Sequence, residues 1–147
     1  MENNPVISAV TDIAASPEEG WKVLTDFAGY AQWHPDLSFV DVPTEVRPGT
    51  VLRARLSTGS EMDGDYDFTV LHYEAPRRLA WEGGIPGVVT GDHSFLLDPH
   101  DGGTRYTESE TFTGPAAVET VEPNRAQMEK NSASYGRAIK ERLESDH

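Results

Sequence analysis

Along most of the chain, apolar and polar side chains alternate with the two-residue period of β-strands that bury one face. In the segment 51–58, for example, Leu52, Ala54 and Leu56 share one face, whereas arginine and serine side chains occupy the other. Alternation or β-branched composition predicts seven strands, over residues 6–14, 39–46, 51–58, 66–70, 79–81, 88–97 and 104–113. Short connections separate the last six strands, which is typical of an antiparallel meander.

Two stretches of the chain follow the helical period instead. Ser16, followed by a proline and two glutamates, predicts the start of a short helix that ends near Gly29, and a further helical turn is expected over 30–33. Residues 123–144 predict a final helix of about 20 residues, because apolar side chains recur there at helical spacing. Segment 114–122 is expected to be the loop that leads into this helix.

This order of elements predicts an α+β fold. A meander followed by a long amphipathic helix must bury the apolar face of its sheet against that helix. We therefore expect a curved antiparallel sheet of about seven strands around the C-terminal helix, with two short helices after the first strand. The chain of 147 residues is long enough for one domain with a real core, so we expect a single domain over residues 1–147.

Composition and charge exclude several classes of function. The chain carries 12 basic and 25 acidic residues, a net charge of -13, which disfavours nucleic acids and anionic membranes as partners. It has no cysteine, which excludes disulfides and thiolate chemistry. No signal peptide or membrane-spanning apolar run is recognisable, so a cytoplasmic location is expected. The sequence leaves open whether the protein is a monomer or a homodimer.

A series of short motifs resembles a known superfamily over nearly the whole chain. The motifs are SPEE at 16–19, DF at 26–27, YAQWHP at 30–35, PG at 48–49, PRRLAW at 76–81, GDHSF at 91–95, GGTR at 102–105 and ETFTG at 110–114. Their order and spacing resemble the START-like, Bet v 1-like (SRPBCC) superfamily, and most of all its small bacterial proteins described as polyketide cyclase/dehydratase-like. The resemblance implies a helix-grip fold with an internal cavity for a small, largely apolar molecule. It implies no single activity, since members include enzymes, carriers and receptors.

Side-chain alternation predicts which polar groups face this cavity. In the strand 104–113, Tyr106, Glu108, Glu110 and Phe112 share a face, and the two aromatic side chains mark it as the inner one. A four-residue loop before this strand would set His93, on the neighbouring strand 88–97, opposite Glu110, with Glu108 two residues along. We therefore expect a His93–Glu110 pair inside the cavity.

These three ionisable side chains are the candidate catalytic residues. An imidazole beside a carboxylate can take or give a proton near neutral pH, and a glutamate buried without a positive partner has a raised pKa. His93, Glu108 and Glu110 could thus promote ring closure, loss of water or isomerisation. Two alternatives stay open: the groups satisfy one another as a buried polar network, or the strand end splays and the glutamates meet solvent.

Other side chains are expected to contact the bound molecule. The tryptophans among them could equally be core packing, and the polar residues of the last helix could be partly exposed where it covers the opening. The glycine-rich stretch 83–87 predicts a hairpin connection beside the cavity mouth and a candidate lid. The expected ligand contacts are Trp33, His34, Phe68, Trp81, Phe95, Tyr106, Met128, Asn131 and Tyr135.

Two classes of function follow from this reading. The first is an enzyme that binds a hydrophobic or polyketide-like molecule and cyclises, dehydrates or isomerises it without a cofactor. The second is a carrier or sensor that binds a hydrophobic metabolite and leaves it unchanged. A co-chaperone-like interaction module is a third, for which the sequence has no long apolar patch. The five histidines lack metal-binding spacing, and we expect no metal site; a site formed by His93, Glu108 and Glu110 stays open as an alternative on ligand type alone.

Overall fold

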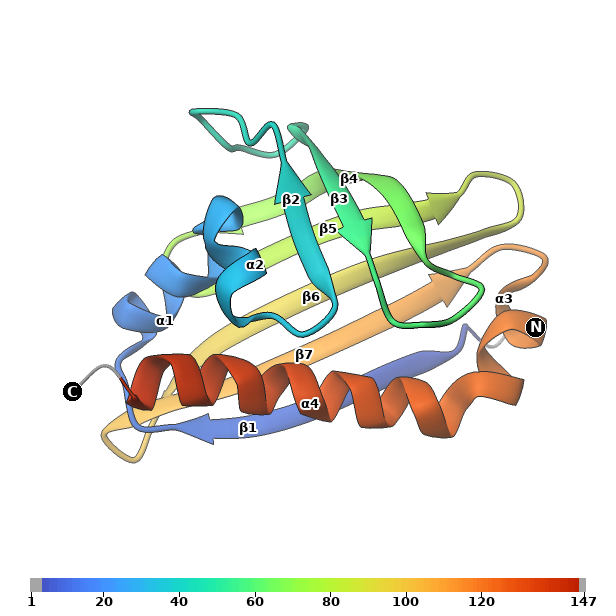
Figure 1. The fold of residues 1–147 in the computed structure, drawn as a ribbon. Helices are drawn as coiled ribbons and strands as arrows, with labels where there is room; N and C mark the ends of the chain where they lie inside the picture. Colours follow the sequence, from blue (N-terminus) through green and yellow to red (C-terminus); the bar gives the residue numbers. More distant parts are fainter. Residues whose placement is uncertain (1–3, 146–147) are drawn as a thin grey trace.

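A computed structural model describes residues 4–145, and it has the predicted curved antiparallel sheet gripping a long C-terminal helix (Figure 1). The sheet has seven strands in the order β1-β7-β6-β5-β4-β3-β2, and each pair of neighbours is antiparallel. The strands are β1 (Val6–Ile13), β2 (Leu37–Val40), β3 (Val51–Leu56), β4 (Gly64–Glu74), β5 (Arg78–Ile85), β6 (Val89–His100) and β7 (Gly103–Thr113).

The helices cover the concave face of the sheet from two sides. α4, the C-terminal helix, lies along β1 and β7, and α1 and α2 connect β1 to β2 (Figure 1). The predicted cap at Ser16 is present, because its side chain accepts a hydrogen bond from the backbone N–H of Glu19. The helical elements are α1 (Pro17–Leu24), η1 (Phe27–Gly29), α2 (Tyr30–Trp33), α3 (Ala117–Val121), η2 (Glu122–Asn124) and α4 (Arg125–Glu144).

Several predicted elements differ from the structure. β4 and β5 are longer than the strands expected over 66–70 and 79–81, so residues 83–85 of the glycine-rich stretch belong to β5 and not to the connection. The strand expected over 39–46 is only the short β2, because Asp41 takes a positive φ of 51° and turns the chain out of the sheet. The segment 114–122, expected to be a loop, contains α3. Ala117 and Val121, one helical turn apart, are both buried in a cluster with Ile7 and Phe112, and this packing stabilises the short helix.

The predicted register between β6 and β7 is confirmed. His93 pairs with Glu110 and Pro99 with Thr104, as expected. The turn is tighter than predicted, since only Asp101 and Gly102 separate the strands, and both take the positive φ values of a two-residue hairpin. The same register therefore results from a shorter loop.

The contact of α4 with the sheet depends on Gly136. A methyl group at this position would lie 2.2 Å from Oγ1 of Thr11 on β1, so only glycine lets the helix approach so closely. We expect Gly136→Ala to lower the free energy of unfolding by about 1 kcal/mol, because the clash outweighs the gain in helix propensity. Urea denaturation measures this, and Thr11→Ala should reduce the cost. A more stable Gly136→Ala protein would contradict the packing.

Candidate functional site

Two cavities lie between the sheet and the helices, and the Trp81 side chain lines both of them. The inner cavity has a volume of about 10 Å³, which is room for about one water molecule. It is lined by Leu24, Tyr30, Trp33, His34, Leu37, Trp81, Phe95, Tyr106, Glu108 and Tyr135. The outer cavity has a volume of about 110 Å³. It is lined by Leu56, Met62, Tyr66, Phe68, Trp81, Gly83, Gly84, Val89, Gly91, His93, Glu110, Phe112 and Thr120.

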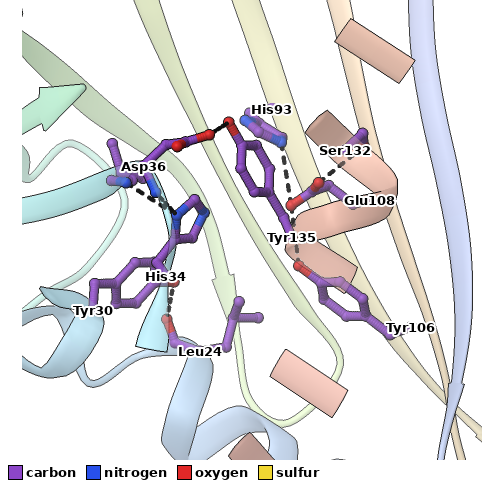
Figure 2. Close-up of polar contacts among 10 residues, drawn as sticks. Leu24, Tyr30, His34, Asp36, His93, Tyr106, Glu108, Ser132 and Tyr135 are labelled. Atoms are coloured by element: carbon purple, nitrogen blue, oxygen red, sulfur yellow. Dashed lines mark hydrogen bonds and ion pairs between the residues drawn. The ribbon is translucent and has the colours of Figure 1, made fainter. Parts of the chain in front are cut away.

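The carboxylate of Glu108 is the centre of the buried polar network (Figure 2). Its side chain is 3% exposed. The Tyr106 hydroxyl donates to Oε1 over 3.2 Å, and the Ser132 hydroxyl of α4 donates to Oε2 over 3.0 Å. Nε2 of His93 lies 3.6 Å from Oε1. This network joins β6, β7 and α4 and holds the imidazole in place.

The partner of His93 differs from the expectation. Although His93 and Glu110 are opposite in the backbone register, the carboxylate in ion-pair contact with the imidazole is that of Glu108. The Glu110 carboxylate instead lies over Gly91, where an added methyl group would be 2.4 Å from its Oε2. Glu110 therefore faces the outer cavity, next to His93, and Glu108 faces the inner one.

A pair of glycines that sequence reasoning missed makes room for the outer cavity. Gly83 on β5 and Gly91 on β6 are directly opposite each other. A methyl group at Gly83 would lie 2.5 Å from the ring of Phe68, as one at Gly91 would meet Glu110. The signal was present in the sequence, because these glycines have the parity of the inward-facing Trp81 and His93.

Burial and neighbouring charges shift the pKa values of the two outer-cavity groups. Burial raises the pKa of the Glu110 carboxyl, and although His93 opposes this, the pKa stays above its ordinary value. For His93, burial acts to lower the pKa, but the charges of Glu110, Glu108 and Asp92 outweigh it and raise the pKa. The raised pKa brings the Glu110 carboxyl closer to neutral pH than in water, and the raised pKa of His93 favours its protonated form, so the pair can supply a base and an acid for acid–base catalysis.

His34 is held as a neutral imidazole. Its Nδ1 accepts hydrogen bonds from the backbone N–H groups of Asp36 (3.1 Å) and Leu37 (3.0 Å), which places the ring proton on Nε2 (Figure 2). Burial lowers the pKa of His34 to about 4. The Tyr135 hydroxyl donates to the Asp36 carboxylate over 2.7 Å, which ties α4 to the loop before β2. His34 is thus suited to orient a ligand or water and not to accept a proton.

The remaining predicted contacts divide between the cavities. Trp33, Phe95, Tyr106 and Tyr135 line the inner cavity with His34, and Phe68 lines the outer one. Two predicted contacts line neither cavity. Met128 packs against the cluster around Phe112 under α3, and the Asn131 side chain accepts a hydrogen bond from Gln127 at the surface. Both lie in the first turns of α4, which extend past the cavities.

The charge coupling can be tested by following the histidine side chains by NMR as the pH changes. We expect His93 to titrate above its ordinary value of 6.5. In a Glu108→Gln/Glu110→Gln double variant its pKa should fall below that value, because burial then dominates. His34 is the internal reference: its pKa should stay well below its ordinary value in both proteins, because burial is the main cause of that shift, and its proton should stay on Nε2. An unchanged His93 pKa in the double variant would contradict this account.

Comparison with known proteins identifies the class to which this fold and site belong. The sequence profile of the polyketide cyclase/dehydrase and lipid transport family matches residues 5–144, so the chain belongs to this family. No curated protein sequence matches the chain significantly.

Solved structures share the fold at low sequence identity. Ara h 8.0201 superimposes with a TM-score of 0.75 at 15% identity, covering 98% of this chain and 100% of its own. The ZhuI aromatase/cyclase from Streptomyces superimposes with a TM-score of 0.74 at 19% identity, covering 97% and 94%. A protein from Arthrobacter aurescens gives a TM-score of 0.73 at 16% identity, covering 95% and 86%. These structures place the chain in the Bet v 1-like, helix-grip fold.

Two further features of residues 4–145 bear on partners and cofactors. No helix among these residues is both long and apolar enough to cross a membrane. Within the same range, no cluster of three or more histidine, aspartate or glutamate side chains is arranged to hold a metal ion.

Proposed function

We propose that this protein binds a hydrophobic, polyketide-like small molecule in the outer cavity and catalyses its cofactor-free cyclisation, dehydration or isomerisation. The observation that carries this proposal is the position of His93 and Glu110, two groups with raised pKa values, on the wall of a largely apolar cavity. Family membership supports binding of a small molecule, and the likeness of fold to an aromatase/cyclase is consistent with the reaction type.

Each ionisable group has a distinct role in the proposed reaction. Glu110 and His93 would touch the substrate and move a proton from a carbon next to a carbonyl group to an oxygen that becomes a hydroxyl or leaves as water. Glu108 is a positioning residue, because it lies in the inner cavity and acts by holding the His93 imidazole. His34, with its proton on Nε2, lines only the inner cavity and could donate a hydrogen bond to the one water molecule for which that cavity has room.

The size of the outer cavity limits the substrate. A volume of about 110 Å³ suits a group of one ring, since cavities of about 150 Å³ bind benzene. A polycyclic molecule would need the surrounding elements to move apart. The turn between β3 and β4 and the β5–β6 hairpin border this cavity, so movement there would enlarge it.

Incubation of the protein with a small-molecule extract from its source cells separates the enzyme from the carrier. Catalysis predicts that one compound disappears while a product of the same mass, or lighter by one water, appears. The alternative of a carrier or sensor is favoured by the mostly apolar lining of the cavity. It predicts a compound that co-purifies with the protein and is recovered unchanged, and this result without any conversion would contradict the catalytic proposal. A cytoplasmic location and the choice between monomer and homodimer stay predictions.

A further inference from the structure

The charges around the two cavities do not balance. Two carboxylates, Glu108 and Glu110, face a single histidine, and neither lysine nor arginine lines either cavity. Glu108 has the closer contact with His93 and accepts two hydroxyl hydrogen bonds besides. Glu110 accepts no hydrogen bond from the described residues, although it is the carboxylate that lines the outer cavity. The half-buried Glu110 carboxylate is therefore left without a hydrogen-bond donor among the described residues, although the His93 charge acts on it.

The walls around this carboxylate are aromatic. Tyr66, Phe68, Trp81 and Phe112 line the outer cavity with Glu110. The rings of Phe68 and Trp81 are stacked, with centroids 5.4 Å apart and planes 10° apart, and Tyr66 stacks on Phe68 at 6.5 Å. Aromatic faces attract organic cations, and a carboxylate that lacks a donor provides the charge-assisted hydrogen bond that an ammonium group needs.

The net charge of the whole chain acts in the same direction. At -13, the protein attracts cations to its surface and repels carboxylates and phosphates. A fatty acid or a phosphate-bearing ligand would also bring a second negative charge beside Glu110. The site therefore disfavours anions both at long range and at contact.

We propose that the natural ligand of the outer cavity is a single-ring compound carrying a protonated amine, whose ammonium group donates to one oxygen of Glu110 and leaves the other free for proton transfer, while its ring lies against Phe68 and Trp81. This inference rests on the proposed function in placing the ligand in this cavity, and it specifies the chemical class of that ligand. The two glycines Gly83 and Gly91 provide the space for the ring.

The test compares four probes that share one ring and differ in the attached group: benzylamine, benzyl alcohol, toluene and benzoate. Binding is measured by isothermal titration calorimetry at pH 7 and physiological salt. We expect benzylamine to bind at least about tenfold more tightly than benzyl alcohol, because both partners of its hydrogen bond to Glu110 are charged and its cation faces aromatic rings, and benzoate not to bind. Equal affinity for benzylamine, benzyl alcohol and toluene would overturn the amine proposal and leave the ligand cavity of the proposed function in place. If none of the four probes binds, the proposal for this cavity fails as well.

Variants then assign the preference to Glu110. Glu110→Gln should remove the preference for benzylamine over benzyl alcohol. Glu110→Asp keeps the charge and should retain part of the preference, so the two variants separate charge from folding. Glu82→Gln, an exposed substitution on the neighbouring strand β5, is the matched control and should change nothing. A benzylamine preference that survives Glu110→Gln would overturn the proposal.

Discussion

Replacing Glu108 with alanine should lower the free energy of unfolding by about 3 kcal/mol, the largest of the stability effects we predict. The substitution leaves His93 and the hydroxyls of Tyr106 and Ser132 without their shared acceptor in the interior. It also leaves a space where the side chain was packed. The expected fall in melting temperature is roughly 10 °C for a domain of this size.

Glu108→Gln is the matched variant, because it keeps the size of the side chain and one acceptor oxygen. We expect it to cost about 1 kcal/mol, since only the charge-assisted part of the network is lost. Glu74→Ala, on an exposed ion pair with His72, controls for the loss of a surface carboxylate and should change stability by less than about 0.5 kcal/mol. Equal stability of Glu108→Ala and wild type would show that the network does not hold α4 to the sheet.

The largest effect on activity is expected for His93→Asn. In the conversion found with the cell extract, we expect the rate to fall by about 10²- to 10⁴-fold, which is the usual contribution of a positioned acid–base group. Asparagine keeps a polar side chain in the cavity wall but cannot accept or release a proton near neutral pH. Initial rates measured by mass spectrometry, with the protein in excess over the compound, would give this ratio.

His72→Asn is the matched control, because His72 also lies beside a glutamate but on an exposed part of β4. It should leave the rate unchanged. Glu110→Gln should reduce the rate by a similar factor to His93→Asn, and the double variant should be little slower than either single one, since the two groups act on the same proton transfer. Unchanged rate and product in both single variants would remove the catalytic role.

The parts of the fold that follow from local patterning could be predicted from the sequence. Alternation along β7 identified the inner face with Glu108 and Glu110, and pairing through the hairpin fixed His93 opposite Glu110, because a slip by one residue would reverse every side chain. α3 was missed because two apolar residues one turn apart are too few to indicate a helix without the cluster they pack into.

The details of the site depend on side-chain directions that the backbone register does not specify. His93 contacts Glu108 and not Glu110, because the Glu110 carboxylate occupies the space over Gly91 that a side chain would otherwise fill. The neutral state of His34 results from burial, and two backbone N–H groups at the start of β2 fix its ring proton on Nε2; neither has a sequence signature. Met128 and Asn131 were misplaced because helical spacing gives a face of α4 but not how far along the helix the cavities extend.

The most direct test of the central claim is a crystal structure of the His93→Asn protein with the compound that the wild type converts. The variant should retain the compound, because binding is kept and the proton transfer is slowed. We predict that its reacting group lies beside Glu110 in the outer cavity. There it would be bordered on one side by the stacked rings of Phe68 and Trp81 and on the other by the strands β6 and β7. A compound bound on another surface, with the outer cavity unchanged, would contradict the account.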